Sequence, residues 1–166
     1  MIISVIGGEG AGPETCAVAE SVGRALGRRG VTLLCGGRGG VMEAACRGAR
    51  REGGHTIGIM PGSNAEESPP NAHVEFPIYT GMGYARNVMV VLSGEAVIAI
   101  SGSYGTLSEI AYCLINEIPV VGIDTWEFAY GGHDSDRIIR VSDPVQAADM
   151  AVSLARSRKA TTAREG

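Results

Sequence analysis

The chain has a single lysine, Lys159, among its 166 residues, and this scarcity removes one class of site. A Walker P-loop ends in Gly-Lys-Ser or Gly-Lys-Thr, so ATP hydrolysis by that route is excluded. The formal net charge of −4 argues against nucleic acid as a partner, which normally needs a basic face. No apolar run reaches the roughly 18 residues of a membrane span, and no basic stretch precedes the apolar start. We therefore expect a cytoplasmic protein that binds neither nucleic acid nor membrane.

Cysteine and histidine are few and scattered. The four cysteines form no C-x-x-C pair, and no histidine stands at ligand spacing from them. We therefore expect no metal site, and we expect the thiols to be reduced and mostly buried. They are Cys16, Cys35, Cys46 and Cys113.

Strand-like apolar runs alternate with helical spacing along most of the chain. The run "IISVI" at 2–6 is continuous and β-branched, as a strand covered on both faces requires. The same reasoning places strands at 31–35, 55–60, 96–101, 119–123 and 137–141, and helices at about 14–29, 40–52, 83–93, 104–116 and 143–156. The alternation predicts an α/β fold, a doubly wound, Rossmann-like parallel sheet with helices on both faces. We expect one domain over 1–156 and a mobile tail over 157–166.

Three segments break this alternation. Residues 61–71 contain three prolines and no period, which is typical of a surface loop. Residues 73–80 form at most a short extended piece, because Pro77 makes a poor central strand. Residues 124–136 are expected to form a polar loop whose Trp126, Phe128 and Tyr130 offer stacking faces.

Glycine is abundant, with 25 residues, and it gathers in turns after the predicted strands. In parallel sheets ligands bind beyond the carboxyl ends of the strands, where these turns fall. The first turn, "GGEGAG" at 7–12, includes Gly8 but satisfies G-x-G-x-x-G in no register. The second strand ends in "CGGRGG" instead of the acidic residue that holds a ribose, so an NAD site of the usual kind is not expected.

The stretch "ISGSYGTLSEI" at 100–110 is the strongest candidate for an anion site. Glycines let the main chain approach a ligand closely, and the amides at a helix N-terminus favour negative charge. Glu109 follows in the same predicted helix, beside whatever the phosphate carries. The residues expected to hold the phosphate are Gly102, Ser103, Tyr104, Gly105 and Thr106.

Two further turns are candidates. In "GGRGGVME" at 36–43, Arg38 is expected either to contact phosphate or to be solvated. In "TGMGYARNVMVV" at 80–91, Arg86 stands early in a predicted helix, where its charge opposes the helix dipole. Such local conflicts often mark function, and a guanidinium suits a phosphate or a carboxylate. The alternative is that Arg86 pairs with a structural acid.

The stretches "GGRGGVMEAACRGA", "ARNVMVV" and "SGSYGTLSEIA" together resemble the Lonely Guy (LOG) family, long mislabelled as lysine decarboxylases. The resemblance covers residues 2–123 and is closest to a bacterial branch that is also similar to molybdenum cofactor carrier proteins. Lonely Guy enzymes hydrolyse the N-glycosidic bond of cytokinin riboside 5′-monophosphates. The resemblance implies a dimer at least, with Glu109 and Arg86 as catalytic residues. It also implies a binding site that includes Gly36, Gly37, Gly39, Gly40, Met42, Gly102, Gly105 and Thr106.

The chain departs from the Lonely Guy signature P-G-G-x-G-T-x-x-E at two positions. Ser101 replaces its proline and Ser103 its second glycine, and Asn87, another candidate ligand contact, stands where the enzymes have lysine. Carrier proteins of this fold bind an organic phosphate without cleaving it. Three interpretations therefore stay open: a phosphoribohydrolase that requires no cofactor, a carrier of molybdopterin or the molybdenum cofactor, and a nucleotide sensor without turnover.

Overall fold

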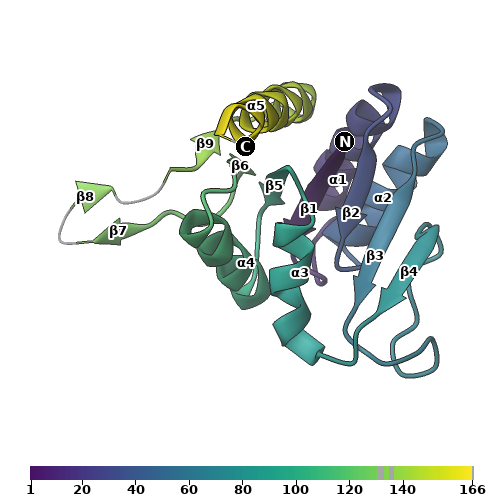
Figure 1. Cartoon of the computed structure of the whole chain (residues 1–166). Coiled ribbons are helices and arrows are strands. Elements are labelled where there is room, and N and C mark those ends of the chain that lie inside the picture. Colours follow the sequence, from purple (N-terminus) through teal and green to yellow (C-terminus); the bar gives the residue numbers. More distant parts are fainter. Residues whose placement is uncertain (131–132, 135–136, 166) are drawn as a thin grey trace.

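The computed structural model describes residues 1–130, 133–134 and 137–165, and it is built around one central sheet (Figure 1). Seven strands lie in the order β4-β3-β2-β1-β5-β6-β9, and each neighbouring pair is parallel. These strands are β1 (Ile2–Gly7), β2 (Thr32–Cys35), β3 (Thr56–Met60), β4 (Phe76–Tyr79), β5 (Ala96–Ile100), β6 (Val120–Ile123) and β9 (Ile139–Arg140).

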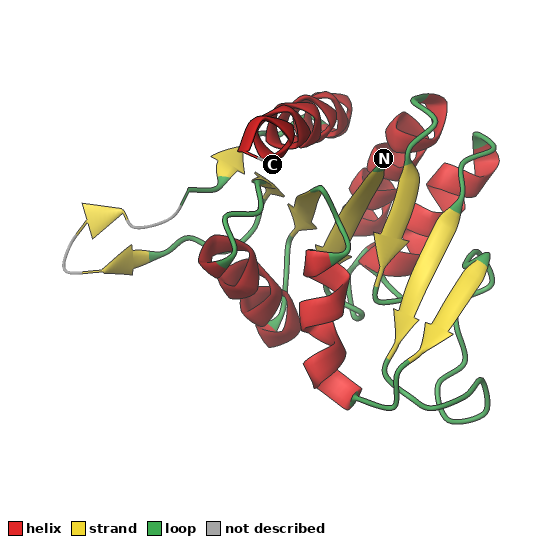
Figure 2. Ribbon diagram, viewed as in Figure 1, coloured by secondary structure: helices red, strands yellow, loops and turns green. Residues whose placement is uncertain are grey.

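Helices cover both faces of this sheet (Figure 2). One face carries α1 (Pro13–Arg28), α2 (Val41–Arg51) and α5 (Pro144–Glu165). The other carries the 3₁₀ turn η1 (Gly83–Arg86), α3 (Asn87–Leu92) and α4 (Tyr104–Ile115). The doubly wound parallel sheet predicted from the alternation of apolar runs is therefore confirmed.

The two faces of the sheet bury separate hydrophobic cores. Ile3 and Val5 of β1 pack with α1, α2 and α5, whereas Ile6 belongs to the core beneath α3 and α4. This division follows from the alternation of side chains along a strand. Because both faces are covered, the strands need the continuous apolar runs seen in the sequence.

Three segments refine the expectations drawn from the sequence. The strand with Pro77 lies at the sheet edge, in register with β3 alone, as a proline strand should. The segment expected to be a loop after β6 contains two short antiparallel strands, β7 (Ala129–Tyr130) and β8 (His133–Asp134). The last helix does not end near residue 156 but continues to Glu165, because no proline or glycine interrupts the tail before that residue.

The switch in winding direction falls between β1 and β5, which are neighbours at the centre of the sheet. From β1 the chain crosses to α1 on one face, and from β5 it crosses to α4 on the other. The connections therefore diverge at the carboxyl ends of these strands, which leaves a crevice there. In the part of the chain that the structure describes, no helix has the length and apolar character to cross a membrane.

Candidate functional site

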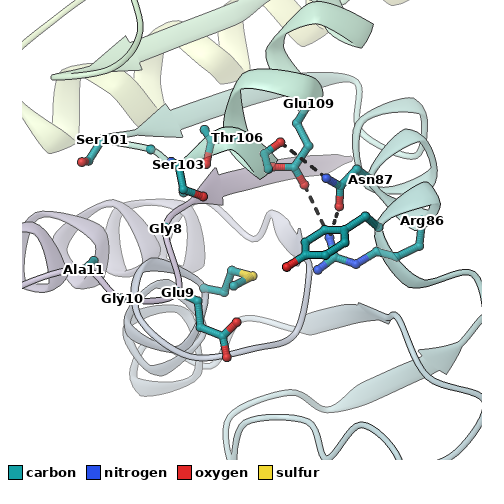
Figure 3. A pocket seen from close by; sticks show the side chains of 15 residues that line it. Gly8, Glu9, Gly10, Ala11, Arg86, Asn87, Ser101, Ser103, Thr106 and Glu109 are labelled. Carbon is teal, nitrogen blue, oxygen red and sulfur yellow. Dashed lines mark hydrogen bonds and ion pairs between the residues drawn. The ribbon is translucent and has the colours of Figure 1, made fainter.

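A cavity of about 350 Å³ opens at this switch point, at the carboxyl ends of β1 and β5 (Figure 3). Its walls come from the turns after β1 and β5, from η1 and the first residue of α3, from the first turns of α4 and from Met42 of α2. The cavity brings together many of the residues singled out in the sequence: Gly8, Met42, Arg86, Asn87, Gly102, Ser103, Gly105, Thr106 and Glu109.

Glu109 projects from α4 into this cavity wall and is only 6% exposed. Its Oε1 lies 3.5 Å from Nη1 of Arg86. Burial raises the pKa of Glu109 to about 7, because a desolvated carboxylate is costly, and the charge of Arg86 offsets only part of that cost. A carboxyl group with this pKa can exchange a proton near neutral pH, which is the property of a general acid or base.

Arg86 ends η1 and is 8% exposed. Its Nη1 donates to Oδ1 of Asn87 at 2.8 Å, and its Nη2 donates to the carbonyl oxygen of Gly36 at 3.4 Å. Its Nε is buried and has no hydrogen-bond partner among the described residues. An unpaired donor on a charged group is costly, and the guanidinium lines the cavity, where its charge favours an anion. Both interpretations of Arg86 from the sequence meet here, because the acid that it pairs with is the candidate catalytic acid.

The turn after β5 leads directly into α4, whose N-cap is Ser103. Oγ1 of Thr106 accepts a hydrogen bond from the backbone N–H of Ser103 at 3.3 Å, and Oγ of Ser103 accepts one from the backbone N–H of Thr106, so the two residues form a capping box. The amides of Tyr104 and Gly105 have no partner within the helix. Gly102 has a φ of 149°, which a side chain would disfavour. Ser101 has a φ of 52°, uncommon for a residue with a Cβ, and such strain often occurs at functional sites.

The carbonyl oxygens of this turn are held by the segment after β6. Oγ1 of Thr125 donates to the carbonyl of Ser101 at 2.6 Å, and Nε1 of Trp126 donates to that of Ser103 at 3.2 Å. The turn is thus braced through its acceptors. Because the amide of Thr106 is capped by Ser103, the donors left available to an anion are the amides of Tyr104 and Gly105.

The turn "GGRGG" at 36–40 packs behind the cavity wall and is not among the residues that line it, so its ligand role stays a prediction. A Cβ on Gly36 would lie 2.5 Å from Nη2 of Arg86, and one on Gly40 would overlap the carbonyl oxygens of Gly8 and Glu9. These close approaches fix the positions of the Arg86 guanidinium and of the turn after β1. The residues concerned are Gly36, Gly37, Arg38, Gly39 and Gly40.

Arg38 likewise has a partner within the protein. Its Nη2 lies 3.1 Å from Oε1 of Glu9, which ties the turn after β2 to the turn after β1. Both side chains of this ion pair are exposed, and the phosphate contact considered for Arg38 stays a prediction.

The sequence reasoning missed part of the cavity lining. The unexpected residues are Gly7, Glu9, Gly10, Ala11, Tyr84 and Ser101. Most of them belong to the turn after β1, which lacks the G-x-G-x-x-G spacing and from which only Gly8 was predicted at the site. Only the place of this turn, directly after the central strand, could have predicted that it lines the cavity, because any such turn reaches the switch point.

The aromatic residues singled out in the sequence lie in different surroundings. The side chain of Tyr104 is 82% exposed, lies outside this cavity and stacks on Trp126 with ring centroids 6.1 Å apart. Phe128 packs against the core beneath α3 and α4. The side chain of Tyr130 lies outside the described residues.

The cysteines are free, and Cys35, Cys46 and Cys113 are buried while Cys16 is half-buried, as expected. Among the described residues, no three His, Cys, Asp or Glu side chains are grouped so as to hold a metal ion.

Comparison with known proteins identifies two kinds of relative. The solved molybdenum cofactor binding protein of Rippkaea orientalis is 34% identical, with a TM-score of 0.81 over 92% of this chain and 96% of that one. The molybdenum cofactor carrier protein of Chlamydomonas reinhardtii is 31% identical, with a TM-score of 0.79 over 95% and 98%.

The second kind is an enzyme. The cytokinin riboside 5′-monophosphate phosphoribohydrolase of Mycobacterium marinum is 29% identical over 133 residues. The match covers 80% of this chain and 64% of that enzyme, so it spans less than two thirds of the enzyme's length.

A family model described as the SLOG cluster4 family matches residues 1–148, nearly the whole sheet and its helices. Together with the named phosphoribohydrolase and the carrier structures, this match confirms the likeness to Lonely Guy proteins inferred from the three motifs. The chain belongs to the SLOG cluster4 family.

Proposed function

We propose that this protein binds a nucleotide-like organic monophosphate at the switch point and hydrolyses the N-glycosidic bond of a nucleoside 5′-monophosphate. One observation carries the proposal: a carboxyl group that titrates near neutrality, Glu109, lies 3.5 Å from a buried arginine in the wall of the cavity. Perturbed carboxyl groups in clefts are candidates for catalytic acids and bases. The phosphoribohydrolase of Mycobacterium marinum supports the reaction class.

The phosphate would lie at the N-terminus of α4. The amides that open this helix face an anion favourably, and Gly102 and Gly105 carry no Cβ to keep it away. The guanidinium of Arg86, which lines the cavity, offers a positive charge to the phosphate. Binding energy at the phosphate would then position the ribose beside Glu109.

In the proposed reaction, water attacks C1′ of the ribose while the bond from C1′ to the base nitrogen breaks. The electron pair of that bond leaves with the base, which takes up a proton, and Glu109 accepts the proton that water loses. Ionised Glu109 also stabilises the positive charge that develops on the sugar. The products are ribose 5-phosphate and the free base.

A second candidate function is a carrier for the molybdenum cofactor. The observation in its favour is the match to two molybdenum cofactor proteins over nearly the full length of all three chains. The terminal phosphate of molybdopterin would lie at the same amides, near the guanidinium of Arg86. No metal ligand from the protein is required, because the dithiolene that binds molybdenum belongs to the cofactor.

The test is incubation with adenosine monophosphate and isopentenyladenosine monophosphate, with chromatographic detection of the free base. We expect release that falls about 100-fold or more in Glu109→Gln, since general base catalysis contributes at least that factor. The matched control is Glu117→Gln, an exposed acid just beyond the same helix, which should retain the wild-type rate. Retention of the nucleotide or of molybdopterin without any base release would favour the carrier.

We further propose a cytoplasmic homodimer, as the resemblance to Lonely Guy proteins implies. Exposed apolar side chains lie on the outer face of α3 and α4, including Leu92 at 51% and Ile115 at 73% exposure. Burying such a surface between two copies would be favourable. Sedimentation of the wild type beside Leu92→Glu and Ile115→Glu tests this assembly, which we expect both substitutions to weaken.

A further inference from the structure

A second hollow, of about 500 Å³, lies on the other side of the α4 N-terminus. It is lined by Tyr84, Asn87, Ser103, Tyr104, Gly105 and Ser108. Four of these residues, Tyr84, Asn87, Ser103 and Gly105, also line the first cavity, so the two hollows share a wall and meet there.

Two exposed tyrosines line this second hollow. Tyr84 is 87% exposed and Tyr104 is 82% exposed, which is unusual for large rings beside a cavity. Tyr104 is held in place, because its ring stacks on Trp126 and Trp126 donates a hydrogen bond to the carbonyl of Ser103. The carbonyl of Trp126 in turn accepts from Nη2 of Arg140 at 3.0 Å. An ordered, exposed aromatic face is suited to stacking on a flat heterocycle.

Gly105 lines both hollows and has no side chain to separate them. A Cβ built there would meet nothing closer than Asn87 Nδ2 and Ser103 Oγ, both at 3.8 Å. Two hydrogen bonds hold the side chain of Asn87: its Nδ2 donates to Ser108 Oγ at 3.1 Å, and its Oδ1 accepts from Arg86. The two hollows therefore share residues at the helix N-terminus, with no side chain on Gly105 between them.

From this arrangement we propose a second ring subsite, formed by Tyr84 and Tyr104, so that the ligand is dinucleotide-like: two flat heterocycles joined through phosphate. This inference rests on the proposed phosphate site and extends it. One ring system lies in the first cavity, the phosphates lie at the start of α4, and the second ring stacks on the tyrosines. The absent G-x-G-x-x-G spacing does not oppose it, because that pattern concerns the turn after β1 alone.

The experiment compares two probes that carry the same two phosphates, ADP and diadenosine diphosphate, by calorimetric titration of the full chain. We expect diadenosine diphosphate to bind at least about fivefold more tightly, because each stacked base contributes a comparable factor or more. In Tyr104→Ala and Tyr84→Ala the ratio of the two affinities should fall about 5- to 100-fold. Tyr104→Phe, which keeps the ring, should retain the ratio.

The matched control is Tyr112→Ala, which removes another exposed tyrosine of α4 that lies outside both hollows and should leave the ratio unchanged. Sedimentation of each variant shows whether it keeps the assembly state of the wild type. Equal affinity for the two probes in the wild type would overturn the second subsite. A fall in the ratio that comes with dissociation of subunits would also overturn it, because the tyrosines would then act as subunit contacts.

The two proposals fail separately. Adenosine monophosphate that binds and is cleaved, with no preference between the two diphosphates, overturns only the second subsite. A tyrosine-dependent preference without release of base from any monophosphate overturns the hydrolase and supports the second subsite. No binding of any probe overturns both.

Discussion

The turns at 36–40 and 101–105 look alike in the sequence, since each is a glycine-rich stretch between a strand and a helix. In the structure they differ in what surrounds the glycines. A Cβ on Gly37 would overlap Met60 and one on Gly40 would overlap backbone, whereas a Cβ on Gly105 would have 3.8 Å of clearance. The first turn is closed by the protein itself, and the second is open to a cavity.

This difference shows that glycine serves two purposes at the edge of one sheet. In the closed turn it allows two backbones and a buried guanidinium to approach, which sets the position of Arg86. In the open turn Gly105 leaves space that an external molecule can fill, although a Cβ on Gly102 would lie 2.9 Å from Thr106. The same residue type therefore indicates packing in one place and ligand access in the other.

Gly40→Ala should produce the largest change. Gly40 has a φ of 62°, and a methyl group there would overlap the carbonyl oxygens of Gly8 and Glu9. We expect a loss of about 3 kcal/mol in the free energy of unfolding, measured in urea. Gly10→Ala is the control, because a Cβ there meets nothing within 4 Å, and it should stay within about 0.5 kcal/mol. Equal losses would remove the contrast between closed and open positions.

Arg86→Met should weaken binding of adenosine monophosphate about 10- to 100-fold, because a charge-assisted hydrogen bond to the ligand is lost. It also leaves Glu109 buried without its cation. Arg38→Met, in the closed turn, removes only an exposed ion pair and should change the affinity by less than about fivefold. Titration calorimetry measures the affinity of both variants. A larger loss of affinity in Arg38→Met than in Arg86→Met would indicate that the ligand binds at the turn at 36–40 instead.

The pH dependence of stability should report Glu109. Its folded pKa of about 7 lies above the ordinary value of 4.5, so folding favours the protonated form. The resulting stabilisation is complete below pH 4.5 and is lost as the pH rises to about 7. Denaturant titrations across this window should show the decline in the wild type, and Glu109→Gln should lack that part of it. If catalysis needs the ionised carboxylate, base release should rise over the same interval.

Gly105→Ala should have the smallest effect on stability and the opposite sign from Gly40→Ala. The residue is helical and has room for a methyl group, so the unfolding free energy should rise by about 0.5 kcal/mol. The methyl group enters the space shared by the two hollows, so affinity for adenosine monophosphate should decrease. Tighter binding by this variant would contradict an anion path at Gly105.

Much of the architecture was predictable because it depends on local patterns. Continuous β-branched runs indicated strands buried on both faces, and helical spacing between them indicated crossovers. Glu109 and Arg86 stood out for a similar reason, since each is a charge placed in an otherwise apolar or glycine-rich stretch. The extension of α5 to Glu165 was missed because polar composition was taken as a sign of mobility, although nothing in the tail breaks a helix.

The sequence by itself determined the order of strands and helices, the parallel sheet and the edge of that sheet at which a ligand would bind, because these follow from short-range periodicity and the handedness of crossovers. Only the tertiary structure decided which glycine turn is open, that Arg86 pairs with Glu109, and that Glu109 titrates near neutrality. Those properties depend on contacts between residues far apart in the chain. Burial and the distance between charges are set when the two faces of the sheet close over them.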